Sequence, residues 1–568
     1  MSPLRIEEIE FKDGPKCKVP RILLLVGPNG SGKSLALSEI YRLLYKRDHE
    51  YRSPEIISAV NFELPRGRSE ALKLLSTTYM QNPSEPEIFR VLACNNSGDI
   101  KDVAIHPQLF ELENQPELLR QGHLREALMD TFVVFPRLQT ILTCLENKQM
   151  QVMTEGVQPN NIHQLFLKYP FKRNKVNALL RKTFNKSICV ELQNNGELRF
   201  VISRKEIVPT TIAINPSHDE QQFFKECRSY TKFGDGFKVF AGLVTLVFSC
   251  DHRILLLDEP ELYLHAPLIR KLAQELVGEF EERDGTIVAA THSADFVAGC
   301  LEATDDVAIV RLSYSEDTKV GAVSIVDHEM LKRFIRNPVL RNLDALPGLF
   351  YEAVVIVEGQ NDKIAYSEVN RRLVQHKKGI RDVLFIGATG KTGLLTLGEP
   401  FARSGIPTAL VYDFDALLDQ TVPRQIEEFA SIYATKSQQT VLAKQMAACI
   451  QTLQSYSKED LKKVGTGALT KNHASQVKSL LAKLASFGVF IVPLGEVESW
   501  FLKLGFPDTG RKNDKLTVAM EGLPSKGIPH DLSDSTDSVW AFVHHISEWV
   551  QSCHQKQSLL QTEEDLVK

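Results

Sequence analysis

The feature that most constrains this chain is GPNGSGKS, residues 27–34, which directly follows the apolar run RILLLV and precedes the helical pattern LALSEIYRLLY. A strand, a glycine-rich loop and a helix in this order form a P-loop, whose backbone N–H groups surround nucleotide phosphates. Lys33 would reach the β- and γ-phosphates, and the Ser34 hydroxyl would bind magnesium. The pattern therefore predicts an ATP-binding α/β domain, with nucleotide contacts from Gly27, Asn29, Gly30, Gly32, Lys33 and Ser34.

Two later strands end in residues that would complete this nucleotide site. The run RILLL ends in Asp258 and Glu259, and TIVAATHS places His292 after a further strand. Asp258 is expected in the magnesium shell, and Glu259 is placed to polarise an attacking water. His292 is a candidate contact of the γ-phosphate, because it follows the next strand of the same predicted sheet.

The order GPNGSGKS, LLLDEP, THS resembles the ABC-type ATPase heads of SMC and RecF proteins. The stretch LDEPELYLH resembles the OLD (overcoming lysogenisation defect) branch of these heads. The resemblance implies that two heads pair, with ATP between one P-loop and the signature loop of the other head. The sequence LSGGQ is absent, and the segment in the corresponding place is KFGDGFKVFAGLVTLV, in which Gly234 and Gly236 open a helix.

An insertion of about 82–230 separates the P-loop from this segment, and it lacks the sustained heptads of a long coiled coil. The Asn-Asn-Gly turn in ELQNNGELRFVI predicts a β-hairpin. Residues 168–205 are rich in lysine and arginine. Two interpretations of this basic stretch stay open, namely a solvated face and a surface for the phosphate backbone of a nucleic acid.

The C-terminal half predicts a carboxylate site at the ends of parallel strands. YEAVVIV ends at Glu358, with Asp362 one tight turn later, and IPTALVYDFDAL delivers Asp413 and Asp415. Such strand ends meet at one edge of an open α/β sheet. Clustered acids repel one another, and their hard oxygen atoms select magnesium or manganese. ATGKTG, residues 388–393, lacks P-loop spacing and is at most a phosphate-facing turn.

These four carboxylates resemble, one by one, the motif of the Toprim domain found in topoisomerases, primases, RNase M5 and OLD nucleases. The resemblance covers about 350–505 and implies further carboxylates at Glu496 and Glu498, which would allow two metal ions to support phosphodiester cleavage. OLD-type nucleases also use a lysine beyond this strand to neutralise charge on the phosphate. Lys526 is the candidate here, and its competitors are Lys503, Lys512 and Lys515.

The expected architecture is α/β throughout. An ABC-type P-loop ATPase head with a helical/β insertion would span 1–345. A Toprim-type parallel-sheet domain would span 346–568, with a helical insertion at about 416–487 and a mobile C-terminal tail. The chain has 568 residues, a net charge of −4 and nine scattered cysteines without a C-x-x-C pair, which fits a cytoplasmic protein. No signal-peptide pattern or membrane-spanning run is predicted.

An ABC head followed by a Toprim domain resembles the OLD-family ATP-dependent nucleases, which include the nuclease of the Gabija anti-phage system and the effectors of some retrons. The resemblance implies a DNA endonuclease with ATP and Mg²⁺ or Mn²⁺ as cofactors, acting in bacterial defence. It also implies homodimers or higher oligomers through the heads, and a partner defence protein or retron nucleic acid. Two alternatives stay open: an ATP-regulated DNA clamp that recruits a separate effector, and topoisomerase or primase chemistry.

Overall fold

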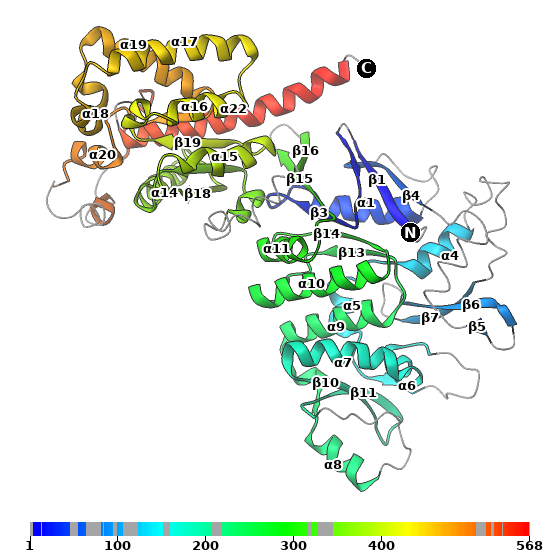
Figure 1. The fold of residues 1–568 in the computed structure, drawn as a ribbon. Coiled ribbons are helices and arrows are strands. Elements are labelled where there is room, and N and C mark those ends of the chain that lie inside the picture. Colours follow the sequence, from blue (N-terminus) through cyan, green and yellow to red (C-terminus); the bar gives the residue numbers. More distant parts are fainter. Residues whose placement is uncertain are drawn as a thin grey trace. The chain divides into compact units, whose positions relative to one another are not determined.

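A computed structural model gives the fold of this protein (Figure 1). The residues that it describes are 4–12, 14–45, 55–63, 81–82, 85–94, 99–105, 123–150, 159–205, 217–315, 320–326, 345–506, 519–523, 527–534, 536 and 538–566. The chain forms two compact units, which are described separately. Unit 1 comprises residues 1–26 and 32–310, and unit 2 comprises 27–31 and 311–568.

The largest sheet has the strand order β16-β15-β3-β14-β13-β8, in which β3, β14, β13 and β8 belong to unit 1. Strands β3, β14, β13 and β8 run parallel. Every residue of β3 and β14 is buried, as expected for apolar strands that are covered on both faces. The bounds of the six strands are β3 (Ile22–Val26), β8 (Val133–Val134), β13 (Ile254–Asp258), β14 (Thr286–Ala290), β15 (Val307–Ser315) and β16 (Val320–Val326).

The helices of unit 1 pack closely where glycine allows it. A Cβ added to Gly242 would lie 2.1 Å from the Ile141 carbonyl oxygen, and one added to Gly299 would lie 2.5 Å from the Arg270 carbonyl oxygen. Glycine therefore sets the approach of α9 to α5 and of α11 to α10. The helices are α1 (Lys33–Tyr45), α4 (His123–Phe132), α5 (Leu138–Thr143), α6 (Ile162–Lys168), α7 (Pro170–Phe184), α8 (His218–Glu226), α9 (Asp235–Ser249), α10 (Ala266–Glu282) and α11 (Ala294–Ala303).

Smaller sheets complete unit 1. The predicted hairpin is confirmed, because β10 (Ser187–Leu192) and β11 (Glu197–Ser203) pair antiparallel around the Asn-Asn-Gly turn. β9 (Lys148–Gln149) and β12 (Arg228–Ser229) also pair with β11. The other two sheets are formed by β1 (Arg5–Phe11), β2 (Lys16–Lys18) and β4 (Ile57–Glu63), and by β5 (Gln81–Asn82), β6 (Glu85–Cys94) and β7 (Ile100–Ile105).

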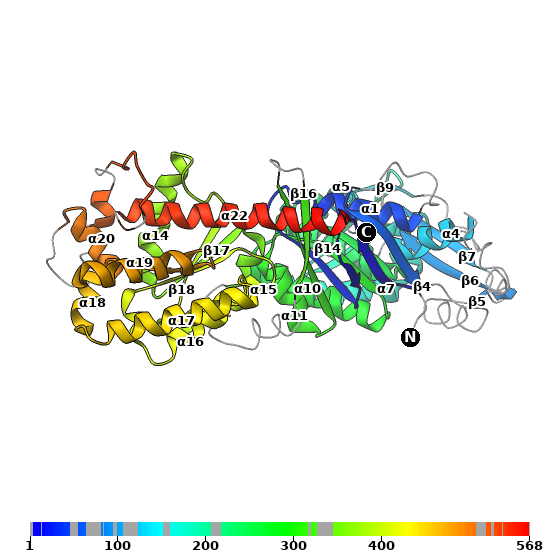
Figure 2. The ribbon, with the colours of Figure 1, turned by 90° about the horizontal axis from the view of Figure 1, so that it is seen from above.

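Unit 2 contains a four-stranded parallel sheet with the order β18-β17-β19-β20. Its strands are short and apolar, and β17 and β19 are buried along their whole length. Figure 2 shows these strands in a layer between α22 on one side and α16 and α17 on the other. The strand bounds are β17 (Ala353–Val357), β18 (Val383–Gly387), β19 (Thr408–Tyr412) and β20 (Val489–Ile491).

Alternate residues of the central strands face the two helical layers. Val355 and Val411 belong to one core with Tyr366 of α14 and Trp540 of α22. On the other face, α15 packs so closely against β19 that a Cβ on Gly398 would lie 2.6 Å from a Leu410 methyl group. The helices are α14 (Gln360–Gln375), α15 (Gly393–Arg403), α16 (Val422–Ala430), α17 (Lys436–Leu453), α18 (Lys458–Val464), α19 (Lys471–Ala485), α20 (Val497–Lys503) and α22 (Val539–Leu566).

The C-terminal segment, expected to be mobile, continues α22 as far as Leu566. Helices α16 to α19 lie between β19 and β20 in the chain, where the sequence predicts a helical insertion. Among the described residues, no helix is long and apolar enough to cross a membrane.

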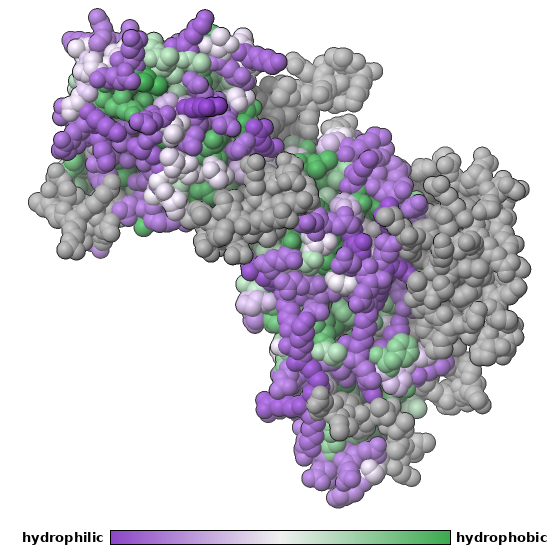
Figure 3. Space-filling model, viewed as in Figure 1, coloured by the Kyte–Doolittle hydropathy of each residue, from purple (hydrophilic) through white to green (hydrophobic). Residues whose placement is uncertain are grey.

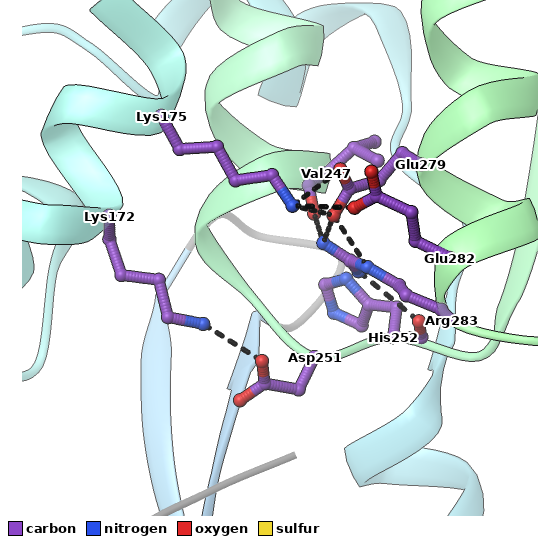
Figure 4. A network of polar contacts seen from close by, with 8 residues as sticks. All are labelled: Lys172, Lys175, Val247, Asp251, His252, Glu279, Glu282 and Arg283. Atoms are coloured by element: carbon purple, nitrogen blue, oxygen red, sulfur yellow. Dashed lines mark hydrogen bonds and ion pairs between the residues drawn. The ribbon is translucent and has the colours of Figure 1, made fainter. Parts of the chain in front are cut away.

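A network of polar contacts joins α7 to α10 and to the end of α9 in unit 1 (Figure 4). Lys172 pairs with Asp251 at 2.8 Å, and Lys175 pairs with Glu279 at 2.7 Å. The Arg283 guanidinium also pairs with Glu279 and donates to the Val247 carbonyl oxygen at 2.9 Å. Because the side chain of Glu279 is only 2% exposed, these two cations are needed to balance a buried charge.

The Lys172–Asp251 pair yields a prediction about stability. Both side chains are nearly buried, at 9% and 11% exposure, so Lys172→Met would leave the Asp251 carboxylate buried and unbalanced. We expect this change to lower the free energy of unfolding by about 3–5 kcal/mol in urea denaturation. The matched control is Lys182→Met on the same helix, because Lys182 pairs with Glu275 while 67% exposed. Its expected cost is below about 1 kcal/mol. Equal losses for both variants would contradict the prediction.

Candidate nucleotide and carboxylate sites

The P-loop adopts a backbone that requires glycine at three positions. Gly27, Gly30 and Gly32 have φ values of +144°, +77° and +86°. A Cβ on Gly32 would also lie 2.5 Å from the Ile56 side chain. Asn29 and Gly30 are exposed at the tip of the loop, while Lys33 is buried at the start of α1. The loop therefore turns tightly from β3 into α1, as a phosphate-binding loop must.

The P-loop helix and β13 bring two of the predicted magnesium ligands into direct contact. The Ser34 hydroxyl donates to Asp258 Oδ1 at 2.9 Å, although 224 residues separate them. The contact forms because β3 and β13 flank β14 in the sheet and end at the same edge. This hydroxyl–carboxylate pair is suited to bind a magnesium ion that accompanies ATP.

The turn after Asp258 is strained. Glu259 and Tyr263 are left-handed, with φ of +47° and +63°, which is costly for residues other than glycine. The Glu259 N–H donates to the Ala290 carbonyl oxygen at 2.9 Å, and its carboxylate lies 3.8 Å from His292 Nε2. Burial and then the charge of Lys33 lower the pKa of His292. The structure thus groups Asp258, Glu259 and His292 with the P-loop lysine.

Glu261 is a residue of this site that the sequence analysis missed. Its carboxylate accepts from the Thr291 hydroxyl at 2.8 Å and from the His292 N–H at 2.6 Å. Burial raises the pKa of Glu261, and these hydrogen bonds oppose the rise. Glu261 therefore ties the turn after β13 to the residues after β14. Its position three residues after Asp258 in LDEPE was the available signal.

The segment expected to replace a signature loop begins α9. Gly234 is the N-cap residue and has open space where a Cβ would be. Gly236 has a different requirement, because a Cβ there would lie 2.7 Å from the Tyr263 carbonyl oxygen. Close packing against the strained turn therefore explains Gly236 within one chain. A role for either glycine at the ATP of a partner head stays a prediction.

Five of the ten lysines and arginines in the basic stretch 168–205 form ion pairs with acidic residues. On the face shown in Figure 3, the surface over α7 and α10 is largely hydrophilic. Besides the network of Figure 4, Lys182 pairs with Glu275, Arg199 with Glu191 and Lys205 with Glu226. This pairing favours the solvated-face interpretation over a surface for phosphate backbones.

In unit 2, Glu358 and Asp413 meet at the carboxyl ends of β17 and β19. The Asp413 N–H donates to Glu358 Oε1 at 3.0 Å. Asp362 lies in the first turn of α14, one turn after Glu358. The end of the neighbouring β18 packs so closely against the turn after Glu358 that a Cβ on Gly387 would lie 2.8 Å from the Gly359 carbonyl oxygen. The parallel register therefore places the two predicted motifs side by side.

Asp415 faces a lysine that the sequence analysis treated only as part of a turn. Asp415 lies in the 3₁₀ helix Phe414–Leu418 and is 8% exposed. Lys391 Nζ donates to Asp415 Oδ2 at 3.1 Å, and it lies 3.9 Å from Asp419 Oδ2. The signal that was available is the lysine in ATGKTG, directly after a strand adjacent to β17.

Burial and negative charge dominate the electrostatics of this site. Burial raises the pKa of Glu358 to about 7, with further contributions from Asp415 and Asp362, while the Asp413 N–H and Lys391 oppose the rise. Tyr366 is 1% exposed, and burial followed by the charges of Asp413 and Asp362 raises its pKa well above the usual value. The buried Tyr366 hydroxyl is therefore not positioned as a nucleophile toward DNA, as a topoisomerase would need.

The segment after β20 reaches the same strand ends. The Phe414 N–H, between the two aspartates, donates to the Gly495 carbonyl oxygen at 2.7 Å. This bond brings Glu496, the N-cap residue of α20, next to the loop of Asp413 and Asp415. Glu498 follows in the first turn of α20, with both carboxylate oxygens buried. Lys526, Lys512 and Lys515 lie outside the described residues, and Lys503 ends α20.

The donor set fits a hard divalent cation. Six carboxylates follow the ends of three strands, β17, β19 and β20, and carboxylate oxygens are the preferred ligands of magnesium and manganese. Burial, and to a smaller extent Asp415 and Asp362, raises the pKa of Glu358, so a bound cation would stabilise its ionised form. Among the described residues, no three acidic, histidine or cysteine side chains are already arranged around one point as metal ligands. Lys391 and the Asp413 N–H instead occupy part of the carboxylates' bonding capacity.

Comparisons with known proteins match one segment in each half of the chain. Residues 216–298 match the family described as "AAA domain, putative AbiEii toxin, Type IV TA system". Residues 349–415 match "Overcoming lysogenization defect protein-like, TOPRIM domain". The Old nuclease of Escherichia phage P2 is 21% identical over 266 residues, which cover 43% of this chain and 43% of that protein. The match thus spans less than half the length of this curated relative.

Among solved structures, the SMC head domain from Thermotoga maritima is 13% identical, with a TM-score of 0.28, and covers 57% of this chain and 99% of that chain. An SMC head bound to the C-winged helix domain of ScpA is 14% identical, with a TM-score of 0.31, and the match covers 58% of this chain and 99% of the SMC head.

The fold and the family matches define a protein with an ATPase domain and a Toprim domain. The predicted α/β fold class, with an ATPase domain and a parallel Toprim sheet, is confirmed. The resemblance to the OLD family is confirmed as well, through its Toprim domain and the Old nuclease.

The contacts of Glu261 yield a prediction about the ATPase site. Glu261→Ala removes the acceptor that holds the His292 backbone and the Thr291 hydroxyl. We expect ATP hydrolysis to fall about tenfold or more, because the residues around the γ-phosphate lose their alignment. ATP binding should stay within about threefold, because the P-loop provides most phosphate contacts. Phosphate release and binding of a fluorescent ATP analogue measure the two effects. The control is Glu281→Ala, at an exposed position of α10. Unchanged ATP hydrolysis in Glu261→Ala would refute the role assigned to Glu261.

Proposed function

We propose that this protein is a divalent-metal-dependent DNA endonuclease whose Toprim carboxylates cut phosphodiester bonds under the control of the ATPase head. The observation that carries the proposal is the contact between the Asp413 N–H and Glu358 Oε1, which joins the two halves of the Toprim motif at one sheet edge. The homology to the Old nuclease supports the same activity. Residues 1–345 are proposed as the ATPase domain and 346–568 as the Toprim nuclease domain.

The proposed reaction is hydrolysis of a phosphodiester. A water oxygen bonds to phosphorus, the bond from phosphorus to one sugar oxygen breaks, and that oxygen leaves with a proton. Magnesium or manganese, when bound, would stabilise the attacking and leaving oxygens. Glu358, Asp362, Asp413 and Asp415 would hold the ions, and a carboxylate of this group would accept the proton that water loses. Glu496 and Glu498 are proposed to complete a two-ion site.

The ATPase head is proposed to regulate cutting. Gly27, Asn29, Gly30, Gly32 and Lys33 would bind the ATP phosphates, and Ser34 and Asp258 would hold its magnesium ion. Glu259 would polarise the attacking water, and His292 would contact the γ-phosphate. Dimerisation through the heads, with Gly234 and Gly236 at the partner's ATP, is proposed from the resemblance to ABC-type heads.

Bacterial anti-phage defence is the proposed biological role, because the matched relatives include a phage nuclease and a toxin-type ATPase. A partner defence protein or a retron nucleic acid is the proposed trigger. A cytoplasmic location is proposed, since the substrate would be invading DNA.

Cleavage of supercoiled plasmid tests the proposal. Wild-type protein in Mg²⁺ or Mn²⁺ should nick or linearise the plasmid, and Asp413→Asn should reduce the rate by about a thousandfold or more, because an essential ion ligand is lost. Chelation of the divalent ion should abolish cutting. The matched control is Asp460→Ala, an exposed aspartate in α18 of the same unit, with an unchanged rate expected.

ATP and the Lys33→Ala variant then separate the roles of the two domains. A change in cleavage rate with ATP that disappears in Lys33→Ala would establish regulation by the head. Cutting by Asp413→Asn at the wild-type rate would overturn the assignment of the Toprim site. Absence of wild-type cutting with every ion and nucleotide tested, together with DNA binding, would favour the clamp that recruits a separate effector.

A further inference from the structure

Lys391 occupies an unusual place beside the Toprim carboxylates. It lies in the turn between β18 and α15, between Gly390, whose φ is +98°, and Gly393. Its side chain is 24% exposed, and its ammonium group lies 3.1 Å from Asp415 Oδ2. The turn is anchored at its start, because the Gly390 N–H donates to the Glu358 carbonyl oxygen at 3.0 Å. The backbone of the turn thus fixes the position of Lys391 beside the carboxylates.

Asp415 is the principal partner of Lys391. Asp419, which lies farther from the ammonium at 3.9 Å, uses its Oδ1 to accept from the Thr421 hydroxyl and from the N–H groups of Thr421 and Val422. Those bonds explain why the pKa of Asp419 is lowered, with Lys391 a smaller cause. The strongest bond of the ammonium is therefore to a carboxylate that the proposed function assigns to a metal ion.

A divalent ion and an ammonium group compete for the same oxygen. An ion bound to Asp415 Oδ2 would repel a lysine at 3.1 Å, so the two cations cannot both keep this contact. The lysine side chain has four rotatable bonds and can swing while its turn stays in place. The position it leaves lies beside the carboxylates, where the phosphate of a bound DNA strand would meet the ions.

Resting on the proposed function, we propose that Lys391 is an exchangeable counter-ion. It neutralises Asp415 before a divalent ion binds, and it contacts a DNA phosphate oxygen once the ion has taken Asp415. Lys391 lies in the turn after β18 and is therefore distinct from the lysine beyond β20 that the resemblance implied. A lysine is suited to both roles, since its compact positive charge pairs equally with carboxylate and phosphate.

Metal binding tests whether Lys391 competes with a divalent ion for Asp415. Titration of the full-length, nucleotide-free protein with Mn²⁺, followed by electron paramagnetic resonance, gives the affinity. Lys391→Met should bind Mn²⁺ roughly threefold to thirtyfold more tightly than wild type, because no ammonium competes for Asp415. The matched control Lys444→Met, on an exposed position of α17, should leave the affinity unchanged. Equal or weaker Mn²⁺ binding by Lys391→Met would overturn the competition.

DNA binding tests whether Lys391 contacts a DNA phosphate, and this test does not require cleavage. Affinity for a linear duplex is measured at several salt concentrations, with and without a fixed concentration of Ca²⁺. In Ca²⁺, Lys391→Met should show a salt dependence shallower than wild type by about 0.9 in log–log slope, the value for one lost phosphate contact. Without a divalent ion the two slopes should coincide, because Lys391 is then paired with Asp415. Coincident slopes in Ca²⁺ would overturn the phosphate contact.

Cleavage in saturating Mn²⁺ separates this inference from the proposed function. Lys391→Met should cut about a hundredfold more slowly than wild type, and Lys391→Arg should recover part of the rate. If wild-type protein binds the duplex and shows the metal-dependent slope but does not cut, the nuclease proposal fails and the role of Lys391 stands. Failure of wild-type protein to bind the duplex in Ca²⁺ would overturn both.

Discussion

Parallel strands that end at one edge of a sheet are the constraint on which both candidate sites depend. The hydrogen bond from Ser34 to Asp258 exists because β3 and β13 flank β14 and point the same way. The bond from the Asp413 N–H to Glu358 exists because β17 and β19 pair in parallel register. Strand ends leave backbone groups and side chains free of the sheet's own hydrogen bonds, so polar groups can gather there without breaking the core.

Placing several carboxylates close together costs free energy through mutual repulsion, and the two sites offset this cost in different ways. At the nucleotide site, the Glu261 carboxylate is satisfied by two hydrogen bonds, and the charge of Lys33 acts on His292. In the Toprim unit, burial, with smaller contributions from Asp415 and Asp362, raises the pKa of Glu358. Lys391 offsets part of this charge through Asp415. In the exchange proposed above, a divalent ion takes the place of Lys391 at Asp415.

The basic stretch of unit 1 shows why charge runs read from a sequence mislead. Residues 168–205 have the composition of a nucleic-acid surface, yet Lys172 and Lys175 point into the molecule and balance Asp251 and Glu279. A cation that is already paired and partly buried cannot release counter-ions from DNA. The acidic partners come from the segment after α9 and from α10, more than seventy residues away in the chain, so no local pattern predicts them.

The sequence by itself predicted the nucleotide site and the carboxylate site, because each depends on short motifs directly attached to apolar strands. It also determined the α/β class and the β10–β11 hairpin, which follow from strand runs, helical spacing and one Asn-Asn-Gly turn. Only the tertiary structure decided that Glu261 holds the His292 backbone, that Gly236 serves close packing against Tyr263, and that Lys391 faces Asp415. These contacts join separate strand ends, and their geometry is set by strand order and register, which no local run of residues encodes.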